Sequence, residues 1–245
     1  MASKKAAKSE RRTITWGLVV AFVMLVAAFL FLRSEYFTVS NYVITGINTV
    51  TRDDIVARCS QLEHNLFAFD VDKAKMLIEA SPWVQSASIS RRLPDTIVIS
   101  IVERVPVAFV PMENGTYLVD MEGRILAEDD GKRHGLVALT GVVGQASPGQ
   151  FLDDTTYGWA FRVLAALGQI SRTKLAEIHI QDGECTLILD DECAVLLGKE
   201  APGVSQKTLL LESILQDLSQ DGFYAEHIDL RFDKPVVRFP QEVGG

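Results

Sequence analysis

The sequence contains few of the residues, and none of the short motifs, from which catalytic and metal centres are usually built. It has three cysteines and four histidines in 245 residues, with no Cys-x-x-Cys pair and no His-Glu-x-x-His motif to hold zinc. A phosphate-binding Gly-Lys-Ser/Thr loop and a Gly-x-Ser-x-Gly nucleophile elbow are also absent. We therefore predict a protein that is not an enzyme, with no catalytic residues, no metal site, no cofactor and no small-molecule substrate.

The cysteines are too few for a disulfide scaffold. We interpret Cys59, Cys185 and Cys193 as isolated small apolar side chains. One bridge between Cys185 and Cys193 remains an alternative in an oxidising compartment, since they flank a predicted hairpin turn. With Asp190 and Asp191 at that turn, however, the two cysteines would not lie directly opposite each other.

Adjacent acidic residues recur, but at positions typical of turns and helix starts. Asp side chains there accept hydrogen bonds from free backbone N–H groups, whereas a calcium loop needs oxygen ligands at alternate positions. We predict capping roles for four pairs: Asp53-Asp54, Asp129-Asp130, Asp153-Asp154 and Asp190-Asp191.

Positive charge is scarce outside the first twelve residues. The formal net charge is −8, and residues 1–12 carry five basic and one acidic side chain, a balance of +4 that leaves −12 for residues 13–245. Phosphate contacts require a positive surface. We therefore predict no nucleic-acid binding, and an acidic surface that faces solvent and other proteins.

An apolar run extends from Ile14 to Leu32 and is followed by Arg33. As a helix it would reach about 28 Å, close to the ~30 Å hydrocarbon thickness of a bilayer. The sequence thus predicts a single transmembrane helix over residues 13–33. The excess of basic residues before it predicts that residues 1–12 form a cytoplasmic tail and that the rest of the chain lies outside the cytoplasmic membrane.

Two other interpretations of this run stay open. A cleaved secretory signal also has a basic start and an apolar core, but that core is usually ~7–15 residues long and a small-residue cleavage site follows it. Here the run is followed by Arg33-Ser34-Glu35-Tyr36-Phe37. A helix buried in a soluble core fits less well, because the run is apolar on every face.

Residues 37–105 have the pattern of a small mixed domain. A β-rich segment, Phe37–Ile44, comes first. Thr51 and Asp70 are then placed as N-caps of two short helices, the first ending near Cys59.

Two strands complete this domain, Trp83–Arg91 and Thr96–Val105. Apolar residues alternate along the second strand, as a half-buried strand requires: Ile97, Ile99 and Ile101. The predicted order is β-α-α-β-β, with both helices on one face of a three-stranded sheet.

Residues 106–240 predict a mixed, mainly antiparallel β domain with two flanking helices. Asn114-Gly115 is a strong hairpin signal. One helix is predicted over Asp154–Ile170 and another from Ser205, burying Leu209, Leu211, Ile214, Leu215 and Leu218. Further strands are predicted around Ile178, Leu187 and Val195, then at His227–Phe232 and Val236–Phe239 after a turn at Asp233-Lys234-Pro235. The fold class is therefore α+β.

Several motifs occur in the order found in one protein family. In the first domain these are Asn65-Leu66-Phe67, Asp70, Pro82-Trp83-Val84, Pro94 and Glu103-Arg104-Val105-Pro106-Val107-Ala108. In the second they are Leu196-Leu197-Gly198, Lys207 and Ile228-Asp229-Leu230-Arg231-Phe232. The chain resembles the bacterial cell-division family FtsQ/DivIB, whose members carry a signal anchor, a polypeptide-transport-associated (POTRA) domain and a carboxy-terminal β domain.

The resemblance implies a single-pass scaffold of the division complex at the septum of the inner membrane. Its carboxy-terminal domain would bind the small coiled-coil proteins FtsB and FtsL, and its POTRA domain would assist recruitment through an upstream partner such as FtsK. A POTRA-bearing chaperone or secretion component of the envelope, and an anchored extracytoplasmic enzyme, are the alternatives.

The predicted final strand suggests how a partner would bind. A terminal strand leaves unpaired N–H and C=O groups on its outer side, which are a template for an incoming strand. We predict a partner-binding edge formed by Arg231, Phe232, Val236, Val237, Arg238 and Phe239. The alternative for Phe232 is a core position, and for Arg231 it is a surface ion pair with a neighbour such as Glu226.

Overall fold

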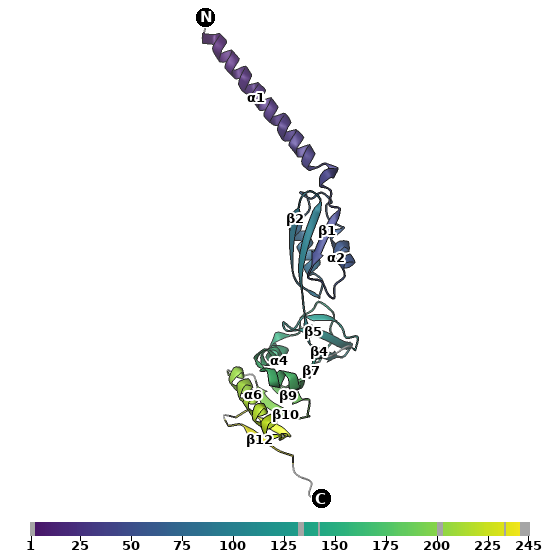
Figure 1. Cartoon of the computed structure of the whole chain (residues 1–245), viewed down its shortest axis with the longest axis vertical. Coiled ribbons are helices and arrows are strands. Elements are labelled where there is room, and N and C mark those ends of the chain that lie inside the picture. Colours follow the sequence, from purple (N-terminus) through teal and green to yellow (C-terminus); the bar gives the residue numbers. More distant parts are fainter. Residues whose placement is uncertain (1–2, 132–134, 142, 200–202, 233, 241–245) are drawn as a thin grey trace. The chain divides into compact units, whose positions relative to one another are not determined.

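The computed structural model describes residues 3–131, 135–141, 143–199, 203–232 and 234–240, with the side chains of residues 3–15 and 156 outside that description. The predicted turn residue Asp233 lies outside the described residues. The chain divides into two compact units (Figure 1): Met1–Ala80 with Val84–Glu103, and Ser81–Trp83 with Arg104–Gly245.

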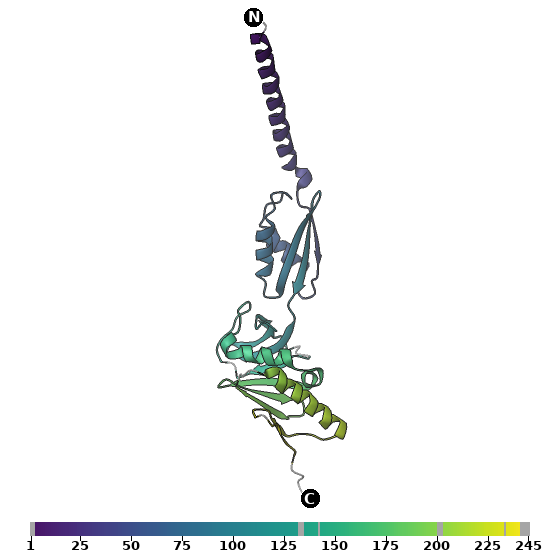
Figure 2. The same cartoon turned by 90° about the vertical axis from the view of Figure 1, so that its left-hand side faces the viewer.

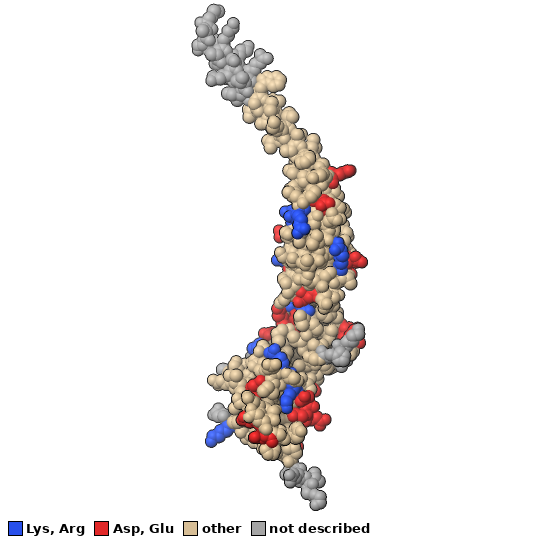
Figure 3. Space-filling model, viewed as in Figure 1, with Lys and Arg blue, Asp and Glu red and all other residues tan. Residues whose placement is uncertain are grey.

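The amino-terminal apolar run belongs to one long helix, α1 (Ser3–Leu32). Because this helix begins at Ser3, the predicted boundary between a tail and a membrane span at residues 12 and 13 does not coincide with a helix end. From Trp16 onward its apolar side chains are exposed, and Figure 3 shows this stretch without charged atoms. A search of the described residues finds no helix that combines the length and the hydropathy needed to cross a membrane.

The first unit confirms the predicted order β-α-α-β-β. A 3-10 turn (Glu35–Phe37) follows α1. The elements are β1 (Asn41–Thr45), α2 (Arg52–Cys59), α3 (Val71–Glu79), β2 (Val84–Arg92) and β3 (Thr96–Glu103). The sheet order is β1-β3-β2, with β1 parallel to β3 and β2 antiparallel to it. The predicted first strand started too early, because Phe37 belongs to the 3-10 turn.

Local signals placed the two helices of this unit correctly. The Thr51 hydroxyl accepts a hydrogen bond from the Asp54 N–H at 3.2 Å, and the Asp70 carboxylate accepts one from the Lys73 N–H at 2.9 Å. Both are N-caps. The alternating row of β3 is buried against these helices, as predicted: Ile97, Ile99 and Ile101.

The second unit is built on one nine-stranded sheet with the order β12-β11-β10-β9-β8-β7-β4-β5-β6. Its strands are β4 (Pro106–Met112), β5 (Gly115–Asp120), β6 (Ile125–Glu128), β7 (Val137–Thr140), β8 (Leu175–Gln181), β9 (Glu184–Leu189), β10 (Ala194–Lys199), β11 (His227–Asp229) and β12 (Val236–Arg238). Its helices are α4 (Asp154–Ala166), α5 (Gln169–Lys174) and α6 (Val204–Asp221). Most neighbouring strands are antiparallel, as predicted; the parallel pairs are β4–β7, β7–β8 and β10–β11.

The helices of this unit pack against the sheet around a single core (Figure 2). Trp159 and Val163 of α4 and Leu211 and Leu215 of α6 are buried there with the inward residues of the strands. All three cysteines of the chain are free and buried, Cys59 in the first unit and the other two in this one.

One predicted helix, Asp154–Ile170, is wrong, because the chain breaks into α4 and α5 at Leu167 and Gly168, both of which have extended backbone. The cause lies 42 residues away. The Glu212 carboxylate of α6 accepts hydrogen bonds from the Ile170 N–H at 2.8 Å, the Ser171 N–H at 3.0 Å and the Ser171 hydroxyl at 2.6 Å. It thereby satisfies the first turn of α5, and the unit has three helices in its described part where two were predicted.

Three smaller expectations also fail. The short strands β6 and β7 were not predicted. Leu209, placed on the buried stripe of α6, is 68% exposed. The strand predicted over His227–Phe232 ends at Asp229, because the backbone N–H of Arg231 turns back to the Asp229 carboxylate at 3.0 Å.

Candidate functional site: an open sheet edge

The last strand of the chain's large sheet lies at an edge. β12 pairs antiparallel with β11 through three residue pairs, His227 with Arg238, Ile228 with Val237 and Asp229 with Val236. β11 continues into the sheet by pairing in parallel with β10. Among the described residues, no hydrogen bond is formed across the outer side of β12.

Each of the other edges of the two sheets has at least one backbone group that is held by a hydrogen bond. On β1, the Tyr42 carbonyl accepts a bond from Arg52 at 2.7 Å. On β2, the Ala87 N–H donates to Glu79 at 2.9 Å.

The far edge of the large sheet is covered in part by a backbone segment. On β6, Ile125 donates its N–H to the Gln150 carbonyl and accepts from the Gly149 N–H, each at 2.8 Å. Of the four edges in the described structure, β12 is therefore the one with no hydrogen bond on its outer side, and unpaired edges recruit further strands unless they are blocked.

The predicted residues of β12 lie on two sides of the strand, one facing the core and one facing solvent. Val237 packs against the core, opposite the buried Ile228. Val236 is 56% exposed. The Arg238 guanidinium lies 3.5 Å from the Glu226 carboxylate, at the surface. An incoming strand could therefore meet Val236 and Arg238 without disturbing the packing of Val237.

Arg231 forms an ion pair with Asp229, and not with Glu226, the neighbour that the sequence suggested as an example. Its guanidinium donates to both carboxylate oxygens of Asp229, at 2.7 to 3.2 Å, while Glu226 pairs with Arg238. Hydrogen bonds from the Arg231 side chain lower the pKa of Asp229 below its ordinary value. Arg231 is thereby held in place beside the end of β11.

Phe232 does not belong to the core. Its side chain is 67% exposed, and the Arg231 guanidinium lies 5.7 Å from the centre of its ring. The core position considered for this residue is wrong, because β11 ends before it and the alternation of the strand no longer applies.

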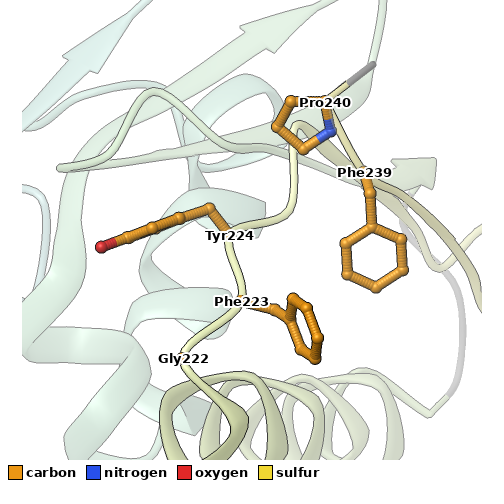
Figure 4. A pocket seen from close by; sticks show the side chains of 5 residues that line it. All are labelled: Gly222, Phe223, Tyr224, Phe239 and Pro240. Atoms are coloured by element: carbon orange, nitrogen blue, oxygen red, sulfur yellow. The ribbon is translucent and has the colours of Figure 1, made fainter. Parts of the chain in front are cut away.

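An apolar hollow of about 470 Å³ adjoins the end of β12. It is lined by Gly222, Phe223, Tyr224, Phe239 and Pro240 (Figure 4). The rings of Phe223 and Phe239 meet edge to face, with centroids 6.0 Å apart and an interplanar angle of 69°.

Two residues of this hollow were missed by sequence reasoning. Phe223 and Tyr224 are 61% and 71% exposed. After the left-handed Gly222, which ends α6, the Phe223 ring lies against Phe239, while the Tyr224 side chain points away from it (Figure 4). The signal in the sequence was a pair of aromatic residues directly after a helix-ending glycine, where no core position was expected.

A second group of titratable side chains lies on β7 and β8. The Thr140 hydroxyl is hydrogen-bonded to Glu177 and lies 2.7 Å from Nδ1 of His179. Across the described parts of the chain, no three His, Cys, Asp or Glu residues are grouped so that they could hold a metal ion.

Two family sequence models match the chain. "POTRA domain, FtsQ-type" matches residues 37–104. "Cell division protein FtsQ/DivIB, C-terminal" matches residues 108–231, just over half of the chain.

Curated relatives point the same way. "Cell division protein FtsQ" of Syntrophotalea carbinolica is 29% identical over 94% of this chain and 89% of its own length. Its namesake in Koribacter versatilis is 24% identical over 73% of this chain, which spans only 53% of that relative. The solved extracytoplasmic domain of DivIB from Geobacillus stearothermophilus, at 17% identity, covers 49% of this chain and 97% of that one with a TM-score of 0.33, too low to carry an argument.

The two matches lie in the order in which the sequence motifs occur, the POTRA model on the first unit and the carboxy-terminal model on most of the second. The Syntrophotalea relative extends the similarity over nearly the whole chain. The chain belongs to the FtsQ/DivIB family of bacterial cell division proteins.

Proposed function

We propose that this protein is a non-enzymatic scaffold of the division machinery and that it binds a partner by strand addition at β12. The unpaired outer side of β12 carries the proposal, because each of the other three sheet edges of the described structure has a backbone group engaged by a hydrogen bond and β12 has none there. A partner strand laid along β12 would gain main-chain hydrogen bonds at no cost to the existing sheet.

Side chains around the edge would give this contact its specificity. Exposed aromatic residues and arginines are the types that contribute most to protein interfaces. Phe232 and Arg231 lie beyond one end of the β11–β12 pairing, and the aromatic hollow with Phe223 and Phe239 adjoins the other. An apolar side chain of the partner would enter that hollow and displace water from it.

The partners that we propose follow from family membership. FtsB- and FtsL-like single-pass coiled-coil proteins would bind the carboxy-terminal domain, and an FtsK-like protein would recruit the chain through the POTRA domain. The domain boundaries that we propose are residues 37–105 for the POTRA domain and residues 106–240 for the carboxy-terminal β domain.

We also propose that α1 anchors the protein in the inner membrane, with the amino terminus in the cytoplasm and both domains outside it, concentrated at the septum. The described side chains from Trp16 to Leu32 support this, because they are apolar and largely exposed to solvent. In the sequence the apolar run begins two residues earlier, at Ile14.

A matched pair of variants tests the edge. Phe232 beside β12 and Phe151 beside the partly covered edge β6 are 67% and 56% exposed, and each ring has an arginine guanidinium within 6 Å, at 5.7 and 5.4 Å. In a pull-down with the full chain as bait, Phe232→Glu should lose the FtsB- and FtsL-like partners and Phe151→Glu should retain them. Equal capture by both variants would remove β12 from consideration.

Localisation tests the scaffold role itself. A fluorescent fusion of the full chain should gather in a band at mid-cell in dividing cells. A uniform envelope signal in dividing cells, with the fusion intact, would contradict a role at the septum.

A further inference from the structure

The end of α1 is joined to the first unit by side-chain contacts. The Asn65 amide donates a hydrogen bond to the Leu32 carbonyl at 2.9 Å, which caps a free carbonyl of the last helical turn. The Phe31 ring lies 5.3 Å from the ring of Phe37, which in turn meets Phe67 at 4.9 Å. Phe37 is only 7% exposed, so this row of rings links α1 to the core of the unit.

The same end of the unit exposes three large apolar side chains. Tyr36 is 63% exposed, Phe67 45% and Leu93 64%. Tyr36 and Phe67 each contact Phe37. Tyr36 also lines a surface hollow together with Pro94, the neighbour of Leu93. The three residues come from three separate segments that meet where α1 ends, and we refer to Tyr36, Phe67 and Leu93 as the apolar foot.

The turn that carries Leu93 is held firmly. The Asp95 carboxylate accepts hydrogen bonds from the Ser40 hydroxyl at 2.8 Å and the Asn41 amide at 2.9 Å, and the Asp95 carbonyl accepts from the Ser40 N–H at 3.0 Å. These bonds tie the turn between β2 and β3 to the segment that follows α1. Leu93 is thus presented to solvent by a fixed turn, which is an unfavourable place for a large apolar residue unless something covers it.

We propose that the apolar foot lies in the interfacial layer of the lipid bilayer, between the headgroups and the acyl chains. The inference rests on the proposed anchoring by α1. Two observations favour lipid over a protein partner: the foot adjoins the exposed apolar surface of α1, where the rings of Phe31 and Tyr36 stack with centroids 6.4 Å apart, and it contains a tyrosine, a residue enriched at membrane interfaces.

The charges around the foot fit the same occupant. The Arg33 guanidinium turns back over the Phe29 ring at 5.2 Å, at the boundary between α1 and the unit. An arginine placed there can reach phosphate groups while its stem covers apolar surface. Arg92 at the end of β2 and Glu35 beside Tyr36 are both exposed. This mixture of signs suits the headgroup layer in general, and we commit to a lipid surface with no preference for anionic lipids.

The native cysteines make a depth measurement straightforward. Cys59, Cys185 and Cys193 are at most 2% exposed, so a nitroxide reagent would label a newly introduced exposed cysteine selectively. The full chain is reconstituted in vesicles of phosphatidylcholine, and collisions of each label with oxygen and with a water-soluble nickel complex are compared.

Three positions form the measurement. Leu93→Cys reports on the foot. Asn48→Cys is the matched control, exposed at the opposite end of the same sheet, where the Asn48 N–H donates to Glu103; β3 alone separates the two ends by about 25 Å. Met24→Cys, 69% exposed in the middle of α1, reports on the anchor itself.

We expect the label at 24 in the hydrocarbon, the label at 93 in the headgroup layer and the label at 48 in water. If the label at 24 lies in the hydrocarbon while those at 93 and 48 are equally accessible to nickel, the interfacial foot is wrong and the anchor stands. If the label at 24 is itself in water, the proposed anchoring fails, and the inference that rests on it fails too.

Discussion

Replacing Gly141 by alanine should reveal how closely two parallel strands approach each other in the second unit. Gly141 follows β7 with φ at +80°, and a Cβ atom there would lie 1.8 Å from the carbonyl oxygen of Ile180 in β8. The two atoms would have to move apart by about 1.6 Å to reach the 3.4 Å of an ordinary contact. Since the obstacle is backbone, no side-chain rotation can relieve it.

The size of the effect follows from a comparison with Gly183. That glycine has nearly the same φ, +76°, in the turn between β8 and β9, but an added Cβ would meet nothing within 4 Å. Gly183→Ala thus carries only the left-handed strain of ~1–2 kcal/mol, offset by ~0.4–1 kcal/mol from the stiffer unfolded chain. Gly141→Ala adds the displacement of β7 from β8, and each ladder hydrogen bond lost contributes about 1 kcal/mol.

We expect Gly183→Ala to lower the free energy of unfolding by about 1 kcal/mol and Gly141→Ala by at least ~3 kcal/mol. For a unit of this size each kcal/mol corresponds to roughly 2–4 °C in Tm. Thermal unfolding followed by circular dichroism would measure both variants beside the unchanged protein. If they lose equal stability, the close approach of Gly141 to Ile180 does not exist and the reasoning is refuted.

Two further predictions concern charged side chains that are held by hydrogen bonds. Arg104, whose side chain is 8% exposed, donates to Asp120 and Glu122; Arg104→Ala leaves Asp120 buried and unpaired and should cost ~3–5 kcal/mol in urea unfolding, whereas a loss below about 1 kcal/mol would show that the pair is solvated. Burial would raise the pKa of Glu212, but the hydrogen bonds from Ser171 and Ile170 outweigh it and lower that pKa. Protonation therefore favours the unfolded state, and the stability that Glu212 contributes should be intact at neutral pH and lost as the pH falls below about 4–5 through the lowered pKa. Glu212→Gln should flatten that part of the Tm profile, and an unaltered acid limb would contradict the assignment.

The features that were predicted correctly from the sequence are mostly those that depend on residues close together in the chain. The caps Thr51 and Asp70 act within three residues of themselves, and the isoleucine row of β3 depends only on alternation along one strand. The cell-division family and the position of the final strand also followed from motifs and element order. These are features for which the determining residues lie next to one another in the chain.

Two of the failures have their cause in distant contacts. Gly168 alone is a weak signal for a break between helices, and the carboxylate that stabilises the start of α5 comes from Glu212 on another helix. The four-residue strand β7 is a strand because it is held between β4 and β8, both parallel to it.

The difference between β12 and the other three edges could not be predicted from the sequence either. It depends on where Arg52 and Glu79 send their side chains. Element order alone placed the final strand at an edge. That it has no hydrogen bond on its outer side, unlike the other edges of the described structure, became visible only from the hydrogen bonds in the structure.

The burial of the three thiols has a chemical consequence. Burial raises the pKa of Cys185 to about 12, and burial together with the charge of Asp191 raises that of Cys193 to about 11. Only the thiolate attacks disulfides and electrophiles, and at neutral pH fewer than about one in a thousand of these groups would be ionised. We expect these thiols not to react with peroxide, glutathione or alkylating reagents in the folded protein. A change in redox conditions would therefore leave the fold unchanged.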